Sequence, residues 1–340
     1  MCRVPDLQVL CKDRINTMIA AEALHNILLF KGTEAQRRRI FFIKSGISFV
    51  YFVFFVCFVL LSFSQLHAQK IYQVKDQRLD EISGIASSMI NEGIYYVLND
   101  SGGKNEVYAI NNIGETFSTI VLSGLTDRDW EDIAIGPGPD STKSYIYVGE
   151  IGDNKAQYRN VSLYRFEEPV LKVKGFKENE KVTIPAEAID KFAFIYEDGA
   201  KDCETLFIDP LYSDVYLVSK REEKVGLYQI KSPLSMDSLN VARRLISLDF
   251  PLAVAGDISK SRDKILIKTY SDVYYWDVLP NQPIEEALKS EPIKLPNIVE
   301  PQGESICWSA DGTRYLTISE TSKDKPLYLY IYPFPEDTFK

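Results

Sequence analysis

A hairpin of two short apolar strands recurs five times along the chain, and this repeat constrains the fold more than any other feature. The two strands of each copy are joined by a turn that contains Gly, Asn, Asp, Ser or Pro. Gly, Asn and Asp tolerate positive φ and Pro fixes φ, so each link is expected to turn tightly. A third apolar strand usually follows. The hairpins cover residues 82–98, 130–148, 203–219, 256–268 and 303–318.

The spacing of the copies indicates a β-propeller. Intervals of 48, 73, 52 and 48 residues separate the equivalent positions, which are Gly84, Asp132, Thr205, Asp257 and Ser305. Four-stranded propeller blades repeat on a scale of about 40–50 residues. We therefore expect an all-β fold, a five- to six-bladed β-propeller of four-stranded antiparallel blades. The alternatives are a β-sandwich or two domains, but no Pro/Gly/Ser-rich linker divides the hairpins.

Two parts of the chain decide how the ring is completed. The 73-residue interval either holds an insertion at residues 170–189 or conceals a sixth blade. The last copy shows only three strands, and an apolar stretch at residues 71–74 precedes the first copy. We expect this N-terminal strand to supply the missing strand and close the ring, which would remove its free edges.

An apolar segment precedes the predicted propeller. Arg37–Arg39 and Lys44 are followed by an uncharged run at residues 45–64, and the small residue Ala68 precedes a polar stretch. This order is typical of a secretory signal, so residues 45–68 are expected to be a signal peptide that is cleaved after Ala68. The alternative is an uncleaved membrane anchor, because the run approaches the roughly 20 residues that span a bilayer.

The export segment sets the expected location of the rest of the chain. The domain at residues 69–340 would lie in the periplasm or outside the cell. If the segment is retained, the domain would be anchored in the inner membrane and face away from the cytoplasm. Residues 1–44 would then be a short cytoplasmic tail; otherwise they are a disordered extension produced by a misplaced start codon.

Charge and histidine content exclude several functions. Residues 1–68 hold 8 of the 39 basic and 4 of the 48 acidic residues, which leaves residues 69–340 with a net charge of −13. This acidity argues against a nucleic-acid partner, because such binding depends on Lys and Arg. Both histidines, His25 and His67, precede the cleavage site. Ser-His-Asp and Cys-His catalysis and histidine-bound zinc are therefore excluded from the mature domain.

Two cysteines, Cys203 and Cys307, remain after cleavage. They could form one disulfide in an oxidising compartment. The stronger expectation is that both are buried as small hydrophobic residues. Trp130 and Trp308, which flank first strands, are likewise expected to be core residues between blades.

Charged side chains concentrate at one end of every hairpin. In an antiparallel hairpin the start of the first strand and the end of the second lie at the same end, so these residues should converge on one mouth of the channel. The candidate metal ligands are the carboxylates Glu131, Asp132, Glu204, Asp257 and Glu304. The candidate ligand-binding residues are Asp100, Asp153, Asn154, Lys220, Arg221, Lys268 and Glu320.

Two interpretations of this mouth remain open. Calcium takes about 6–8 oxygen ligands from carboxylates, carbonyls and water. Crowded carboxylates without a cation are costly, which favours a Ca²⁺ site. The lysines and the arginine could instead pair with the carboxylates and form a collar of ion pairs without metal.

Six short motifs occur in order between residues 79 and 333. They are Ile82-Ser-Gly-Ile-Ala, Asn99-Asp-Ser-Gly, Asp129-Trp-Glu-Asp-Ile-Ala, Gly149-Glu-Ile-Gly-Asp-Asn, Tyr164-Arg-Phe-Glu-Glu-Pro and Pro301-Gln-Gly-Glu-Ser. In this order they resemble a largely uncharacterised family of exported bacterial β-propeller proteins. More distantly, the blades are similar to TolB-type propellers, calcium-dependent phytases and gluconolactonases. That resemblance implies carboxylate-bound calcium in the channel, but no catalytic residue of those families matches here.

Two functions follow from these features. The first is an exported binding or scaffold module that presents a protein, glycan or small-molecule ligand at the acidic mouth; the missing histidines favour it. The second is a calcium-dependent hydrolase of phosphoesters, esters or lactones. In that case Glu131, Glu204 and Glu304 would hold the ion or act as base, and Lys220 and Arg221 would hold an anionic substrate.

Overall fold

The computed structural model describes residues 69–100, 104–126, 128–171, 180–320 and 326–335. The chain separates into an N-terminal unit, Met1–His67, and a second unit that begins at Ala68. The predicted extension at residues 1–44 and the signal or anchor segment at residues 45–68 lie outside the described residues. Within the described residues, no helix is long and apolar enough to cross a membrane.

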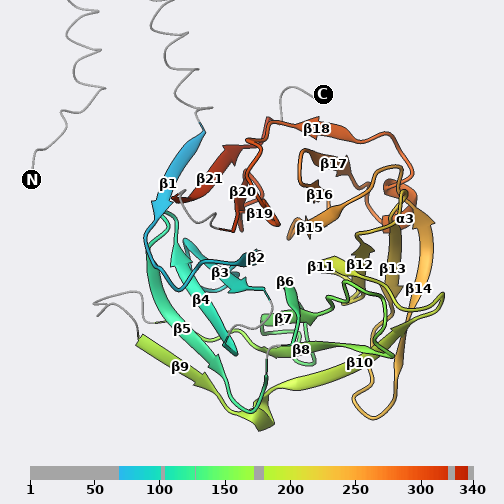
Figure 1. The fold of residues 1–340 in the computed structure, drawn as a ribbon, viewed down its shortest axis with the longest axis horizontal. Coiled ribbons are helices and arrows are strands. Elements are labelled where there is room, and N and C mark those ends of the chain that lie inside the picture. The colour runs from blue at the N-terminus through green and yellow to red at the C-terminus, as the bar shows by residue number, and fades with distance from the viewer. Residues whose placement is uncertain (1–68, 101–103, 127, 172–179, 321–325, 336–340) are drawn as a thin grey trace, which may run out of the picture. The chain divides into compact units, whose positions relative to one another are not determined.

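The described residues form an all-β fold with two short helical segments, η1 (Ala186–Ala188) and α3 (Ile284–Ala287). Its strands fall into five consecutive sets, and the strand that begins each set lies nearest the centre (Figure 1). All five hairpins expected from the sequence are present as antiparallel pairs of first and second strands.

The sets are as follows. The first contains β2 (Ile82–Ser87), β3 (Ile94–Asn99), β4 (Glu106–Asn111) and β5 (Thr116–Leu122). The second contains β6 (Trp130–Gly136), β7 (Tyr145–Glu150), β8 (Val161–Glu167) and β10 (Asp190–Tyr196). The third contains β11 (Cys203–Ile208), β12 (Val215–Ser219), β13 (Gly226–Ile230) and β14 (Asn240–Ser247). The fourth contains β15 (Ala253–Ile258), β16 (Lys264–Thr269), β17 (Val273–Asp277) and β18 (Ile293–Leu295). The fifth contains β19 (Ser305–Trp308), β20 (Arg314–Ile318), β21 (Leu327–Pro333) and β1 (Lys70–Val74).

The N-terminal strand belongs to the last set. β1 pairs antiparallel with β21, so that Lys70 lies opposite Ile331 and Val74 opposite Leu327. The expectation that an N-terminal strand supplies the fourth strand of the last copy is confirmed. The two ends of the described chain therefore share one sheet.

The insertion between β8 and β11 adds strands to existing sheets. β9 (Glu180–Ile184) pairs in parallel with β5, and β10 pairs antiparallel with β8 and in parallel with β14. The last pairing joins the second and third sets into one eight-stranded sheet. In the described part of the 73-residue interval, the extra strands thus connect three sets at their outer edges.

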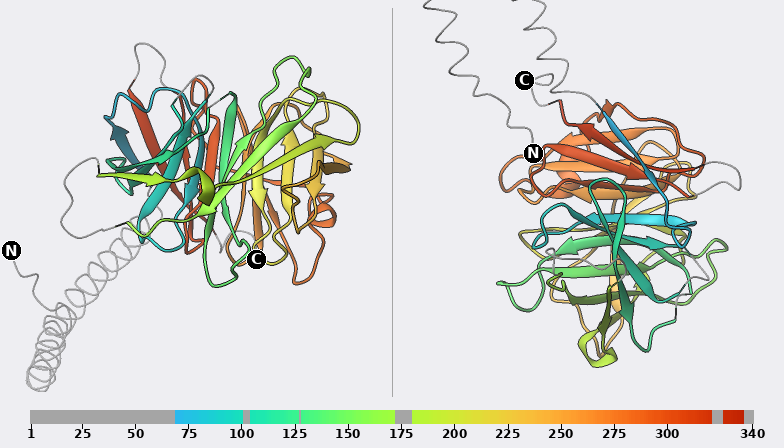
Figure 2. Two further views of the ribbon diagram at one scale, coloured as in Figure 1. Left: turned by 90° about the horizontal axis from the view of Figure 1, so that it is seen from below. Right: turned by 90° about the vertical axis from the view of Figure 1, so that its left-hand side faces the viewer.

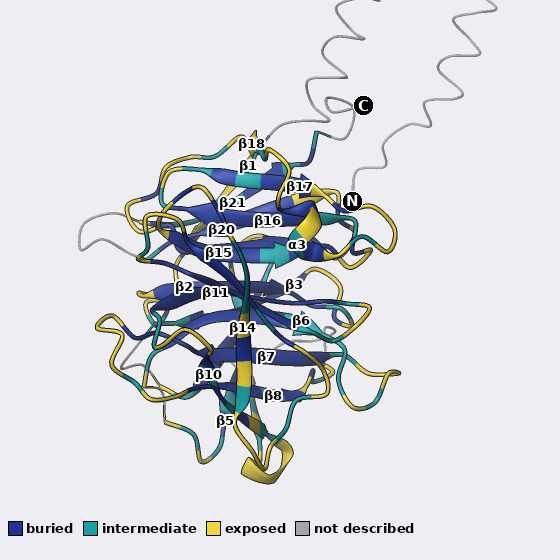
Figure 3. Ribbon diagram, turned by 90° about the vertical axis from the view of Figure 1, so that its right-hand side faces the viewer, coloured by how far each residue is buried: buried dark blue, intermediate teal, exposed yellow. Residues whose placement is uncertain are grey.

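The first strands pack against one another in cyclic order. β2 contacts β6, β6 contacts β11, β11 contacts β15, β15 contacts β19, and β19 contacts β2. A separate hydrophobic cluster fills each of the five interfaces between neighbouring sets. Figure 2 shows the sets from two further sides, and in Figure 3 the strands are largely buried while the connecting loops are exposed.

Two tryptophans and two cysteines lie in this core as the sequence predicted. Trp130 packs between the first and second sets and Trp308 between the fourth and fifth. Cys203 and Cys307 are buried free thiols. All four residues therefore contribute to packing between sets.

Two aspartates, the buried Asp132 and the partly buried Asp257, tie neighbouring first strands together. Asp132 accepts hydrogen bonds from the amides of Ile133 and Leu206, both at 2.8 Å. Asp257 accepts in the same way from the amides of Ile258, at 2.8 Å, and Trp308, at 2.7 Å. In each case the second amide belongs to the next set, so the side chain links two neighbouring sets by a hydrogen bond.

Gly84 sits where β2 and β6 approach most closely. A Cβ at this position would lie 2.8 Å from the Ile133 nitrogen and 2.9 Å from the Asp132 Cα. Backbone atoms cannot move aside like the end of a side chain, so we expect Gly84→Ala to lower the free energy of unfolding by about 1–3 kcal/mol. Urea denaturation measures this, with Ser87→Ala on the same strand as a control that should change it by less than about 0.5 kcal/mol. Equal stability of the two variants would contradict the close approach.

Candidate functional site

Strand pairing and β-bulges bring carboxylates to one end of the sets, which we call the mouth. The pairing of β6 with β7 is irregular at Glu131, and the pairing of β11 with β12 is irregular at Glu204. A bulge changes the direction in which its extra residue points. The Lys220 amide, directly after β12, donates to the Asp202 carbonyl, which holds the start of β11 beside the end of β12.

Five carboxylates gather at the mouth, and we call them the mouth cluster. They are Asp100, Asp129, Glu131, Asp202 and Glu204. Oxygen atoms of Asp100, Asp129 and Glu131 lie within 4.8 Å of one another, and so do oxygen atoms of Glu131, Asp202 and Glu204. Glu131 is common to both groups and therefore stands at the centre of the cluster.

Two of these carboxylates lack partners for their oxygens. Glu131 is only 3% exposed and makes no hydrogen bond or ion pair with any described residue. Oε2 of Glu204 is buried without a hydrogen-bond partner. There is no room for a side chain at Gly152, where a Cβ would lie 2.5 Å from Oδ2 of Asp129 and would collide with Glu131. The cluster is thus a crowded, enclosed set of acceptors.

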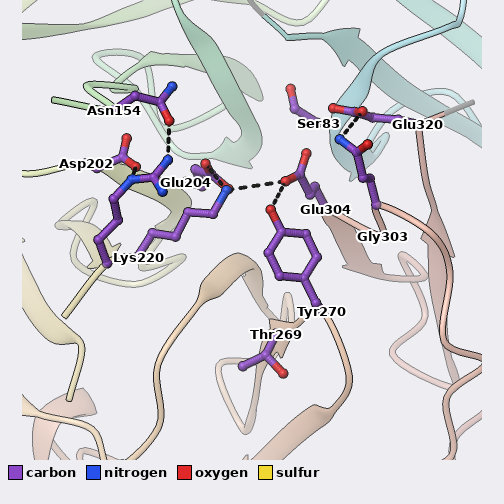
Figure 4. Close-up of polar contacts among 12 residues, drawn as sticks. Ser83, Asn154, Asp202, Glu204, Lys220, Thr269, Tyr270, Gly303, Glu304 and Glu320 are labelled. Atoms are coloured by element: carbon purple, nitrogen blue, oxygen red, sulfur yellow. Dashed lines mark hydrogen bonds and ion pairs between the residues drawn. The ribbon is translucent and has the colours of Figure 1, made fainter. Parts of the chain in front are cut away.

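Basic residues neutralise part of the mouth. Lys220 donates to Glu204 and, at 3.3 Å, to Glu304, which also accepts from the Tyr270 hydroxyl (Figure 4). Arg221 pairs with Asp202 and donates to Asn154. Of the predicted ion pairs, those of Lys220 with Glu204 and Glu304 are present, whereas Arg221 pairs with Asp202 and Lys268 binds backbone carbonyls. These contacts leave Glu131 without a direct ion pair, and the attraction of the nearby Lys220 offsets its burial and the repulsion of its neighbours only in part.

Burial and the excess of carboxylates over basic residues at the mouth raise the pKa values of Glu131 and Asp129. Burial raises the pKa of Glu131 well above its ordinary value, and repulsion from Glu204, Asp100 and Asp129 adds to the shift. Burial raises the pKa of Asp129 in the same direction, with Asp202 contributing. These directions mean that adding negative charge here is unfavourable unless a cation is present.

The surrounding carboxylates stabilise the charged form of Lys220. Burial alone would lower its pKa, but the attraction of Glu204, followed by that of Glu304, raises the pKa above the ordinary lysine value. Lys220 therefore keeps its charge in the closed site and remains bound to both carboxylates.

The other predicted site residues have structural partners. Asp132 and Asp257 face the next set, where their oxygens bind backbone amides, and not the mouth cluster. Lys268 is fully buried and donates to the carbonyls of Thr269, at 3.1 Å, and Gly303, at 2.6 Å. Asp153 accepts from the amides of Gln157 and Tyr158 and so shapes the loop after β7. Glu320 accepts from Gln302 (Figure 4).

Sequence reasoning missed four residues near the mouth. Asp129 and Asp202 each stand two residues before a mouth-cluster glutamate, so the repeated pattern Asp-x-Glu could have revealed them. Tyr270 and Glu300 lie in loops that have no comparable repeat. Their placement depends on the fold alone.

Raised pKa values predict that stability falls as pH rises. Burial raises the pKa of Glu300 to about 7 against the attraction of Lys268, and burial together with Glu304 raises the pKa of Glu320 to about 8. A glutamate titrates near pH 4.3 in the unfolded chain, so the folded protein binds more protons between about pH 4.3 and 8. We expect the metal-free protein to lose roughly 1–3 kcal/mol of stability from pH 5 to pH 8.

Urea denaturation in a chelator at several pH values measures this slope. Glu300→Gln should flatten it, because glutamine does not titrate. A metal-free stability that increases over the same range would show that these carboxyls are not protonated in the folded state.

Comparison with known proteins gives no family assignment. No protein-family model matches the chain, and no curated protein is detectably similar to it. The resemblance to exported bacterial propellers therefore stays a prediction, and the function has to be inferred from the geometry.

Proposed function

We propose that residues 69–340 form a five-bladed β-propeller that binds Ca²⁺ at its mouth and acts as a non-catalytic binding module. The cyclic packing of five first strands, with a hydrophobic cluster in every interface, supports the ring and its blade number. The pairing of β1 with β21 supports closure, because it unites the two ends of the domain in one blade.

The observation that carries the cation proposal is the state of Glu131. A buried carboxylate without hydrogen bonds or counter-ion is costly, and it is normally paired or bound to a metal. Glu131 lies within 4.8 Å of oxygens from Asp202 and Glu204 on one side and from Asp100 and Asp129 on the other. A divalent cation next to Glu131 would compensate this charge.

The ligand chemistry favours calcium. All donors in the mouth cluster are carboxylate oxygens, which suit hard cations. Calcium accepts about 6–8 oxygens in flexible geometry, whereas Mg²⁺ demands a near-ideal octahedron. Glu204 can offer Oε2 while its Oε1 stays bound to Lys220, so metal binding does not require that ion pair to break.

The engagement of the basic residues favours a binding module over a hydrolase. Lys220 is held by two carboxylates, and Arg221 is held by Asp202 and Asn154. Either residue would have to give up an existing bond to hold an anionic substrate. Calcium-dependent turnover of phosphoesters or esters that is lost in Glu204→Gln would favour the hydrolase instead.

We also propose that the domain works outside the cytoplasm. The basic residues and the apolar run that precede residue 69 support export, followed by cleavage after Ala68 or retention as an inner-membrane anchor. Extracellular calcium modules bind with dissociation constants on the order of 10⁻⁴–10⁻³ M, which sets the affinity to expect here.

Calorimetric titration of Ca²⁺ into chelator-treated protein tests the proposal. We expect binding with a dissociation constant on the order of 10⁻⁴ M, weakened at least about tenfold in Glu131→Gln, because each ligand charge contributes to affinity. Asp257→Asn is the matched control, because Asp257 is a partly buried first-strand carboxylate that binds backbone amides, and it should leave the affinity unchanged. Equal affinity in wild type and Glu131→Gln, or no binding in either, would refute the site.

A further inference from the structure

A second pocket lies over the fifth blade. Its volume is about 570 Å³, within the range of about 300–1,000 Å³ typical of small-ligand sites. Its lining includes Glu300, Pro301, Ser319, Glu320, Tyr328 and Tyr330. None of the five mouth-cluster residues lines it.

Tyrosine rings form one wall of this pocket. Tyr328 and Tyr330 are alternate residues of β21, so their side chains project from the same face of the strand. Their ring centroids are 6.1 Å apart, and both residues are only partly buried. The row continues to Tyr332, whose ring is stacked 6.4 Å from that of Tyr330. The planes of the Tyr328 and Tyr330 rings are inclined by 54° to each other, so these partly buried rings offer an angled apolar surface to a ligand.

Polar groups also line this pocket. Ser319 and Glu320 follow the end of β20 and line the pocket. Glu300 also contributes to the lining, and neither of its buried carboxylate oxygens has a hydrogen bond within the described part of the chain. The hydroxyls of Thr317 and Ser319 lie near Glu300, but neither donates a hydrogen bond to its carboxylate oxygens. The pocket therefore combines an apolar wall with unused hydrogen-bond acceptors.

The charges around the pocket select against ionic ligands. The point where a Cβ of Gly303 would sit is 2.8 Å from Nζ of Lys268 and 3.0 Å from Oε2 of Glu300, so the ammonium group faces that carboxylate across the glycine. A cationic ligand would gain little from Glu300, because the buried Lys268 already attracts this carboxylate. An anionic ligand would meet Glu300 and Glu320. A neutral ligand rich in hydroxyl groups meets no such repulsion.

We propose that this pocket binds a neutral saccharide. One face of the sugar ring packs on Tyr328 and Tyr330, and its hydroxyl groups bond with Ser319 and Glu320. Sugar rings expose apolar C–H groups on their faces and hydroxyls at their edges, which matches the pocket's combination of an apolar wall with polar groups. The site goes beyond the proposed calcium function, because its residues are distinct and saccharide binding requires no metal.

An array of neutral mono- and oligosaccharides, followed by calorimetric titration of the best ligand in a chelator, tests this assignment. We expect Tyr328→Ala to weaken binding at least about fivefold and Tyr328→Phe to leave it nearly unchanged, because packing on the ring needs no hydroxyl. Glu320→Gln should weaken binding about three- to tenfold, as expected when one hydrogen-bonding carboxyl group is lost. Tyr212→Ala, which alters a half-exposed tyrosine elsewhere, is the control and should have no effect.

The outcomes separate the alternatives. Failure of every neutral saccharide to bind would overturn the proposal, and so would binding that Tyr328→Ala and Glu320→Gln leave intact. Binding of simple amines such as choline or ethanolamine in place of saccharides would also overturn it. The calcium titration of the Tyr328→Ala variant should match wild type, which keeps a failure of this site distinct from a failure at the mouth.

Discussion

Replacing Lys220 by methionine is expected to lower the free energy of unfolding by about 3–5 kcal/mol, the range measured when one partner of a buried ion pair is removed. The Lys220 side chain is 7% exposed and bonds to Glu204 and Glu304, which are equally buried. Methionine fills a similar volume but leaves two acidic groups without their cation. Urea denaturation near pH 7 in a chelator measures the loss.

Two further variants separate this charge effect from a general packing defect. Lys224→Met breaks a surface pair with Asp249, in which both side chains are largely exposed, and should cost less than about 1 kcal/mol. Adding Glu204→Gln to Lys220→Met should recover part of the loss, because it removes one of the stranded carboxylates. A Lys220→Met protein as stable as the Lys224→Met protein would contradict the account of the mouth.

The second large effect is expected at the end of the strand sets opposite the mouth. Asp209→Ala should cost about 3–5 kcal/mol, because it strands the buried guanidinium of Arg262. Asp209 is fully buried, binds Nε of Arg262 at 2.8 Å and accepts from the amides of Leu211 and Tyr212. The pair joins the turn after β11 to the turn after β15, so it links the third and fourth sets.

Thermal and urea unfolding measure this loss, with Asp249→Ala as a surface control that should stay within about 0.5 kcal/mol of wild type. The calcium affinity of folded Asp209→Ala should equal that of wild type, because the residue lies away from the mouth cluster. If folded Asp209→Ala bound calcium more weakly than wild type, the two ends of the strand sets would be coupled in a way that the structure does not show.

Local sequence chemistry was sufficient to predict the hairpins. Each one combines apolar strands with a turn whose residues favour reversal, and both signals lie within about 20 residues of each other. The N-terminal strand could be assigned because the last copy lacked a fourth strand. The burial of Trp130 and Trp308 followed from their place beside first strands.

The outer connections could not be predicted in the same way. β9 pairs with β5 so that Glu180 lies opposite Ser118, and β10 pairs with β14 so that Phe194 lies opposite Asn240. These parallel contacts join strands that are distant in sequence, and no turn fixes their register. The sequence could therefore locate an insertion without showing what it pairs with.

The candidate site was predictable only in part, because hairpin geometry gives the end of the strand at which a residue lies but not the direction of its side chain. Hairpin geometry placed Glu131 and Glu204 at the mouth, but the same argument included Asp132 and Asp257, whose side chains face the next set. Successive strand residues point to opposite faces, so Glu131 and Asp132 cannot share one role. Which of the two faces the mouth depends on a bulge, and the bulge is not visible in the residue pattern.

The most direct test of the calcium proposal is anomalous X-ray scattering from crystals grown with Ca²⁺ and then exchanged with a lanthanide. The account predicts a peak about 2.3–2.6 Å from carboxylate oxygens of Glu131 and of at least two other mouth-cluster residues. The same crystals of Glu131→Gln should lack this peak. A peak that persists in Glu131→Gln, a peak found only elsewhere, or no peak at the mouth in wild type would contradict the account.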